Sequence, residues 1–95
     1  MLKFEFDSGK DAANRRKHGI SLERVVDFDW AEAQIERDTR RDYGEPRFVA
    51  TGWIEGRLHV VVFARRGDAM RVIGLRKANR REAKRHEETN EATAH

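Results

Sequence analysis

Eight side chains in this protein are of the kinds that perform acid–base chemistry on a phosphate group. Cleavage of RNA without a metal ion needs a base for the 2′-hydroxyl proton, an acid for the leaving 5′-oxygen, and cations that stabilise charge on the phosphate. Histidine, whose ordinary pKa is about 6.5, can transfer a proton in either direction, and arginine donates paired hydrogen bonds to phosphate oxygens. The set comprises one imidazole, one carboxylate and six cations: Lys17, His18, Glu45, Arg47, Arg65, Arg71, Arg76 and Lys77.

Residue type alone does not separate catalysis from binding, because any basic RNA-binding protein carries the same inventory. His18 illustrates the point. It follows Arg15, Arg16 and Lys17 at the expected end of a helix, where cations also stabilise the negative end of the helix dipole. His18 can therefore be interpreted as a proton carrier or as a helix-capping cation, and both interpretations stay open.

The other three histidines predict no further chemistry. His59 lies within an apolar run, which favours a buried or partner-facing histidine, and His86 and His95 fall in an expected surface tail. The four histidines show no metal-ligand spacing, the sequence contains no cysteine, and no glycine-rich phosphate-binding pattern precedes a helix. We therefore expect neither a metal site nor a cofactor.

Charge is distributed unevenly along the chain. The net charge is only +3, but residues 47–81 contain nine Lys or Arg against two Asp or Glu, a net charge of +7. The flanking segments, 23–46 and 82–95, carry −4 and −2. A basic block of this size is typical of proteins that bind a phosphate-bearing partner. A solvated surface on an arginine-rich protein is the alternative interpretation.

Residues 47–75 are expected to form a three-stranded antiparallel meander, around which the chain is organised. The first run alternates apolar side chains on one face, as strands do. The central run is apolar on both faces except at His59, which indicates a strand covered on both sides. Gly56 suits the positive φ of a two-residue hairpin turn. The expected strands are 47–54, 58–64 and 70–75, with turns at 55–56 and 67–68.

The segments before and after the meander predict helices and two short strands. Asp7 or Ser8 caps a first helix that ends near residue 17, with Ala12 and Ala13 as its packing residues. Ser21 caps a shorter second helix. The remaining expected elements are strands 2–6 and 33–38, a charged loop at 38–46, and a surface helix after residue 78.

These signals predict an α+β domain in which two N-terminal helices pack on a small antiparallel sheet and a helix follows it. We expect one domain over residues 1–88 and a disordered tail at 89–95. Only 38% of residues are hydrophobic and 39% are charged, so the core is thin and a bound partner adds stability. No apolar run approaches the roughly 20 residues of a membrane span, and no signal peptide is visible. We therefore expect a cytoplasmic protein with no membrane contact.

Four short motifs follow one another at residues 4–7, 14–21, 43–47 and 71–78. Three of them contain the most specific patterns, N-x-x-K-H-G, G-E-x-R and R-[VI]-I-x-x-R-K-A. In this order and at these distances, the motifs resemble those of the BrnT family from residue 4 to about residue 82. BrnT proteins are toxins of type II toxin–antitoxin modules.

The resemblance implies a RelE-like fold and a ribonuclease activity that arrests translation. It also implies an antitoxin, BrnA, a ribbon-helix-helix protein that neutralises the toxin, so that operator DNA is contacted only through the antitoxin complex. The family's functional positions match this chain in each of the three patterns. They correspond to Lys17, His18, Glu45, Arg47, Arg71, Arg76 and Lys77, with Arg65 as a further basic position.

The leading hypothesis is therefore an endoribonuclease toxin that cleaves RNA by attack of the 2′-hydroxyl without a metal ion. In this hypothesis His18 transfers a proton, and three arginines bind the scissile phosphate: Arg47, Arg65 and Arg76. Three further cations hold flanking phosphates, namely Lys17, Arg71 and Lys77. Two residues orient the site, Glu45 and Asn14.

The rival hypothesis is a binding module without catalysis, whose basic rim docks an acidic antitoxin or a nucleic acid. It is favoured by the single plausible proton carrier, His18. Under either hypothesis, Trp53 and Phe63 are expected to be exposed on the sheet beside arginines. Such a surface suits an acidic amphipathic helix of the antitoxin, because complementary charge speeds association.

Overall fold

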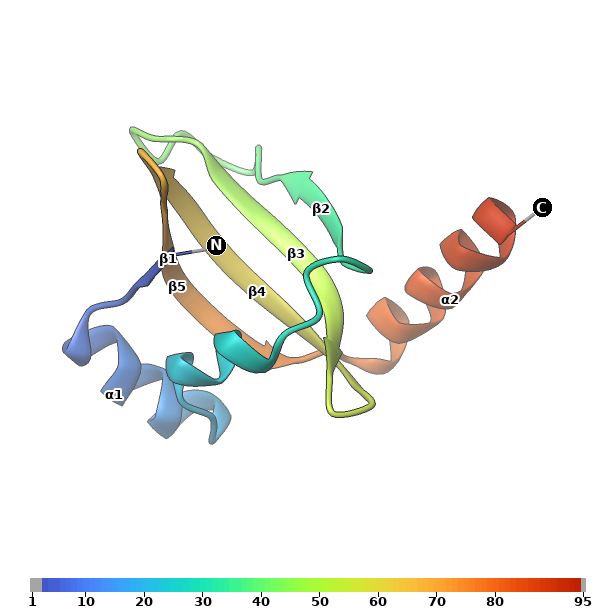
Figure 1. Ribbon diagram of the computed structural model, residues 1–95, viewed down its shortest axis with the longest axis horizontal. Coiled ribbons are helices and arrows are strands. Elements are labelled where there is room, and N and C mark those ends of the chain that lie inside the picture. The colour runs from blue at the N-terminus through green and yellow to red at the C-terminus, as the bar shows by residue number, and fades with distance from the viewer. Residues whose placement is uncertain (1–2, 95) are drawn as a thin grey trace.

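The computed structural model describes the backbone of residues 3–94 and the side chains of residues 3–89. At its centre lies a five-stranded sheet in the order β1-β5-β4-β3-β2. Two helical segments from the N-terminal third lie against one face of this sheet, and a third helix leaves its far end (Figure 1). The expected α+β class is thus confirmed.

The expected meander is confirmed. It consists of β3 (Arg47–Ile54), β4 (Arg57–Arg66) and β5 (Ala69–Lys77), paired antiparallel in chain order. Glu55 and Gly56 both have positive φ, +46° and +77°, which is the conformation that joins two twisted strands through a two-residue turn. Only Glu55 is strained by its positive φ, because glycine adopts this conformation without cost.

Two short strands extend the sheet on either side of the meander. β1 (Lys3–Glu5) pairs parallel with β5, and β2 (Gln34–Arg37) pairs antiparallel with β3. Both were expected, although each is shorter than its sequence pattern suggests. Within residues 3–94, β2 forms the outer edge of the sheet, because no strand pairs with its other side.

The first helix, α1 (Ser8–His18), begins and ends at the expected signals. The carboxylate of Asp7 accepts the Lys10 N–H at 3.0 Å, and Gly19 ends the helix with a φ of +72°. Its packing differs from the expectation, since Ala12 and Ala13 are exposed and Asn14 is the residue that α1 buries. The helix therefore contacts the sheet through an amide and not through alanine methyl groups.

The second helical segment is a 3₁₀ helix, η1 (Leu22–Asp27), with Ser21 at its N-cap. Asp11 of α1 fixes its start, because one carboxylate oxygen accepts both the Ser21 hydroxyl at 2.9 Å and the Leu22 N–H at 2.7 Å. The hydrogen bond from the Leu22 N–H is the main cause of the lowered pKa of Asp11, and the bond from the Ser21 hydroxyl lowers it further. The two N-terminal helices are thus joined by one buried polar junction.

The hydrophobic core lies between η1 and the sheet face that carries Phe48, Val61 and Leu75, which we call the core face. Phe28 packs directly over the backbone of Gly52, where a Cβ atom would lie 2.7 Å from the phenyl ring. Phe63 is only 2% exposed, so its expected exposure is wrong. The buried apolar core residues are Leu22, Val25, Phe28, Ala50, Ile54, Val61, Phe63, Met70, Val72 and Leu75.

The last helix, α2 (Arg80–Ala94), projects away from the sheet (Figure 1). Its backbone is helical through Ala94, beyond residue 89 where we expected the tail to begin, and His95 lies outside the described residues. His86 is only 3% exposed and packs its ring edge-on against Trp53, so its expected place on the surface is wrong. Trp53 keeps 39% of its surface exposed, as expected. Among residues 3–94, no helix is long and apolar enough to span a membrane.

Candidate active site

Strand register places Arg47, Arg71 and Arg76 on one face of the sheet, opposite the core face. We call it the arginine face. Arg47 pairs with Ala64, and Ala64 pairs in turn with Arg71. Residues that pair across antiparallel strands point to the same side. Arg76 pairs with Val60, four residues from Ala64 along β4, and so points to that side as well.

A bulge in β5 makes this arrangement possible. Val62 pairs with Gly74 but Phe63 pairs with Val72, so Ile73 is an extra residue in β5. Side chains alternate along a strand, and five residues separate Arg71 from Arg76, so a regular strand would point the two arginines to opposite faces. The extra residue shifts the alternation by one and brings both onto the arginine face.

Spacing along the sheet divides these arginines into two positions. Arg47 and Arg71 flank Ala64 on neighbouring strands, whereas Arg76 lies beside Val60. Four residues of strand separate the two positions by about 13 Å. This spacing does not fit the expectation that Arg47 and Arg76 bind the same scissile phosphate, and it agrees with the separate role expected of Arg71 only relative to Arg76.

Arg76 is held by Glu82 in the first turn of α2. The two carboxylate oxygens of Glu82 accept hydrogen bonds from Arg76 Nη1 and Nη2 at 2.7 and 2.8 Å. Glu82 also accepts the Asn79 N–H at 2.9 Å, while the Asn79 side chain accepts the Glu82 N–H at 2.8 Å, which is a reciprocal capping box. The hydrogen bond with Arg76 is the main cause of the lowered pKa of Glu82 and of the raised pKa of Arg76.

His18 lies at the C-terminal end of α1, close enough to Arg76 to sense its charge. Burial, followed by the positive charges of Lys17 and Arg76, lowers the pKa of His18 below its usual 6.5. A lowered pKa leaves the imidazole neutral at pH 7, the form that accepts a proton. His18 thus places a base at the β5 side of the sheet, near the Arg76 guanidinium but outside the lining of any hollow described on the arginine face.

Asn14, one helical turn before His18, anchors α1 to the sheet. Its Nδ2 donates to the Leu75 carbonyl at 2.7 Å and to the Ile20 carbonyl at 2.9 Å, and its Oδ1 accepts the Leu75 N–H at 3.3 Å. The amide thereby pairs with β5 as an additional strand would, at a point that β1 does not reach. This pairing sets the position of His18 relative to the neighbouring Arg76.

The loop between β2 and β3 contributes residues that the sequence analysis did not single out. Asp38 is buried, and its carboxylate accepts hydrogen bonds from Arg40 Nε and Nη2 at 2.9 and 2.8 Å and from the Tyr43 hydroxyl at 3.0 Å. The bonds with Arg40 hold the pKa of Asp38 far below its usual value and raise that of Arg40. The Tyr43 ring lies 4.2 Å below the Arg47 guanidinium.

A hollow of about 340 Å³ connects this loop with Arg76. Its floor consists of apolar residues of the sheet, Val49, Val60 and Val62, and charged side chains form its rim. Glu82 raises the pKa of Arg76, and the positive charge of Arg40 opposes a small part of that rise, which indicates that the two guanidinium groups lie near each other. The rim residues include Glu36, Arg37, Asp38, Arg40, Arg76 and Glu82.

The structure does not bring Arg65 and Lys77 to this hollow. Arg65 pairs with Met70, and it lines an apolar pocket on the core face. Lys77 pairs with His59 and lowers the pKa of that histidine, although burial lowers it more. Register therefore separates both cations from Arg76, and the expectation that Arg65 and Arg76 contact one phosphate does not fit the fold.

Two other expected residues have structural partners. Glu45 lies 3.5 Å from Arg66 and ties the loop to the end of β4. His59 is buried, and its Nδ1 lies 2.7 Å from the Arg57 carbonyl, which confirms that it is a satisfied core histidine. Neither takes part in the hollow beside Arg76.

The fold and this site together define a small α+β protein with a hollow on one sheet face whose apolar floor is rimmed by acidic and basic side chains. Residues 6–82 match the family described as the ribonuclease toxin BrnT of type II toxin–antitoxin systems. The match covers most of the chain, so the protein belongs to the BrnT family of ribonuclease toxins. No curated protein matched the chain in a separate comparison. As a member of this family, the protein acts on RNA and has an antitoxin partner.

Proposed function

We propose that this protein is a metal-independent endoribonuclease whose cleavage site is the arginine face around Arg76 and His18. The observation that carries the proposal is that Asn14 anchors α1 to β5 and so brings His18 close enough to Arg76 for the guanidinium charge to act on the imidazole. The family supplies the substrate class, because its members are ribonuclease toxins. The two side chains supply the base and the cation that cleavage through the 2′-hydroxyl requires.

In the proposed reaction, neutral His18 takes the proton of the 2′-hydroxyl, and that oxygen attacks the adjacent phosphorus. The bond to the 5′-oxygen breaks, the leaving oxygen takes up a proton from water, and a 2′,3′-cyclic phosphate forms. His18 later returns its proton to solvent. Negative charge increases on the phosphate oxygens in the transition state, where Arg76 stabilises it. Such a fixed donor is typically worth 10²- to 10³-fold in rate.

Glu82 is proposed to orient Arg76 for this role. A guanidinium has five N–H donors. Two point at Glu82, and Nη1 also donates to the Lys77 carbonyl at 3.3 Å. Among the described residues, Nε–H and the second N–H of Nη2 make no hydrogen bond, so this pair is available to one phosphate. The carboxylate thus aims the guanidinium without using the donors that the substrate needs.

Arg47 and Arg71 are proposed to bind the phosphates that flank the cleavage point, and Lys17 extends the cationic track beside His18. The Tyr43 ring holds the Arg47 guanidinium in place, 4.2 Å from the ring centroid. The RNA strand would then run across the apolar floor of the hollow, about 13 Å from one arginine position to the other.

In the cell, we propose that this cleavage arrests translation in the cytoplasm and that a BrnA-like ribbon-helix-helix antitoxin neutralises the toxin. Operator DNA would be contacted only through the complex with the antitoxin. Expressing the chain alone in bacteria tests the proposal, which predicts growth arrest with rapid loss of RNA. Growth arrest should be prevented by co-expression of the antitoxin.

One observation favours a binding module without catalysis: Arg76 is already neutralised by Glu82. This second candidate predicts that the chain accumulates without harm and that RNA stays intact. The same expression experiment therefore separates the two functions. Harmless accumulation of folded protein would contradict the ribonuclease proposal.

A further inference from the structure

The outer edge of β2 has backbone groups positioned to accept another strand. The Asp38 N–H bonds the Arg47 carbonyl at 2.8 Å, so Asp38 and Arg47 form a hydrogen-bonded pair in the antiparallel ladder. Such pairs alternate with non-bonded pairs along two strands. By this alternation, Ile35 and Arg37 turn their N–H and C=O groups away from β3, toward the open edge.

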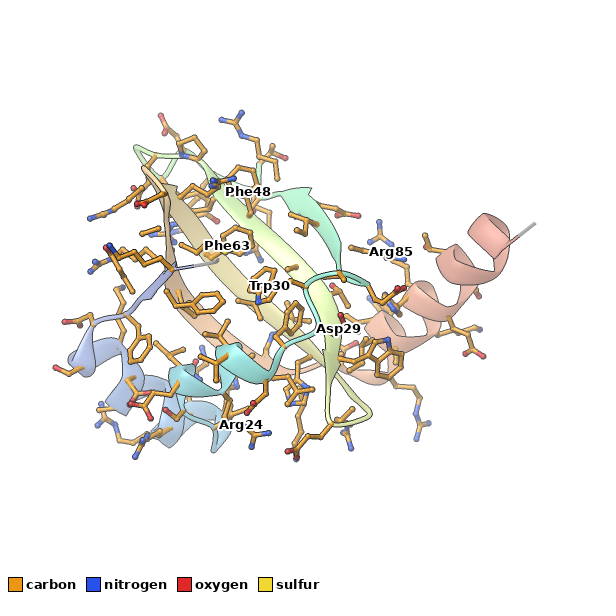
Figure 2. The ribbon with its side chains drawn as sticks, in the orientation of Figure 1. Arg24, Asp29, Trp30, Phe48, Phe63 and Arg85 are labelled. Carbon is orange, nitrogen blue, oxygen red and sulfur yellow. The ribbon has the colours of Figure 1, made fainter. Side chains whose placement is uncertain are left out.

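An apolar pocket of about 320 Å³ lies on the core face beside this edge. Figure 2 shows Phe48, Phe63 and Trp30 in succession along the sheet, beyond the part that η1 covers. Trp30 contributes a buried indole N–H that has no acceptor among the described residues. Ile35 on the edge strand is 51% exposed and completes the lining. The pocket therefore offers a mostly apolar surface beside the open edge of β2.

One cation lines the pocket. Arg65 pairs with Met70 and so lies on the core face, and its side chain contributes to the pocket lining. The side chain of Arg37, although its residue pairs with Phe48, reaches the rim of the hollow on the arginine face. The positive charge of Arg65 is complementary to a partner that carries a carboxylate next to an apolar anchor.

We propose that the edge of β2 and this apolar pocket are the docking site for an extended, acidic segment of the antitoxin. The segment adds a strand through the backbone of Ile35 and Arg37. One of its apolar side chains enters the pocket, and a carboxylate lies against Arg65. Strand addition of this kind takes affinity from the backbone and specificity from the pockets. The proposal rests on the neutralising antitoxin of the proposed function.

The placement has a functional consequence. The arginine face and the docking site lie on opposite faces of the same sheet, so the antitoxin segment need not displace RNA from the hollow directly. Arg65 then contacts the antitoxin, which agrees with its place on the core face, opposite the face that carries Arg76. Variants of the docking site should accordingly weaken antitoxin binding while leaving RNA cleavage unchanged.

The test measures the Kd of the purified chain for the antitoxin encoded beside its gene. Ile35→Pro removes an outward N–H that β3 does not use, a position where an edge strand tolerates proline. Arg65→Glu reverses the charge at the pocket, and Lys84→Glu on exposed α2 is the matched control for charge reversal. We expect at least tenfold weaker binding for the first two variants, a change within twofold for the control, and RNA cleavage within threefold of wild type for all three.

A Kd within twofold of wild type for folded Ile35→Pro or for Arg65→Glu would overturn the proposal. If Ile35→Pro does not fold, hydrogen exchange of the backbone amides is measured for the wild-type chain alone and in complex with the antitoxin. We expect slower exchange at Ile35 and Arg37 in the complex. Unchanged exchange at both residues would contradict the docking site. A wild-type chain that dimerises alone through this edge, or RNA binding lost in Arg65→Glu, would also overturn it. These binding results stay readable even if the wild-type chain cleaves no RNA, which would contradict only the proposed function.

Discussion

Asn14 on α1 pairs its side-chain amide with both backbone groups of Leu75 on β5. This contact joins residues 61 positions apart and attaches the helix that carries His18 to the strand that carries Arg76. It is a positioning contact, because the amide itself is buried. The geometry of the proposed cleavage site depends on it.

Replacing Asn14 by leucine should destabilise the fold by about 2 kcal/mol. The loss leaves the Leu75 N–H and C=O buried without partners, and each unsatisfied group costs about 1–3 kcal/mol. Chemical denaturation checks the change in the free energy of unfolding, with Ala12→Leu on the exposed side of the same helix as the control. A loss below 0.5 kcal/mol, about the scatter of ordinary surface substitutions, would show that Asn14 does not anchor α1.

The pKa of His18 should rise toward its usual 6.5 when Arg76 is replaced by glutamine, because one of the charges that lower it is removed. In the wild-type protein, His18 stays neutral down to a pH below 6.5, so the cleavage rate should be level near pH 7 and fall as the pH drops through the lowered pKa. Titration of the His18 ring signals by NMR measures both proteins. An equal pKa in the two would place Arg76 too far away to act with His18.

Replacing Glu82 by glutamine should lower both stability and cleavage. Glutamine can still accept the Asn79 N–H, but loss of the partly exposed ion pair with Arg76 costs about 1 kcal/mol. Arg76 also loses its orientation, so we expect roughly a tenfold fall in kcat. The stability difference is pH-dependent. The pKa of Glu82 is lowered in the folded state. The ionised carboxylate therefore stabilises the fold fully above its usual pKa of about 4.3, and this stabilisation is lost as the pH falls through the lower pKa of the folded protein.

Denaturation of the wild-type and Glu82→Gln proteins at pH 7 and pH 3 checks this prediction, because the difference between them should narrow at the lower pH. Glu87→Gln, on an exposed part of α2, is the matched control. A rise in cleavage on removal of the carboxylate would mean that Glu82 blocks Arg76 and does not orient it.

Local signals in the sequence were sufficient for the elements of the fold. Asp7 and Gly19 mark the ends of α1, and Ser21 marks the start of η1. Gly56 marks the first hairpin turn. Each of these signals acts within a few residues, where backbone preferences and capping hydrogen bonds decide the conformation.

The arrangement of the site depended on tertiary contacts that no local pattern contains. The bulge at Ile73 changes which face Arg76 occupies relative to Arg71, and strand alternation alone would misplace one of them. The contacts of Glu82 and Arg40 could not be predicted from the sequence, because a long side chain can reach several partners and only the fold determines which one it meets. His86 was misplaced because its ring meets Trp53, which lies 33 residues earlier in the chain.

RNA cleavage by purified Arg76→Ala tests the central claim most directly, with EDTA present so that no free metal ion contributes. Arg57→Ala is the matched control, because Arg57 is an exposed arginine of the same sheet that pairs with Ile54 on the core face. We predict at least a tenfold lower rate for Arg76→Ala, a rate within twofold of wild type for Arg57→Ala, and folded protein in both cases. Equal rates for wild type and folded Arg76→Ala would contradict cleavage at the arginine face.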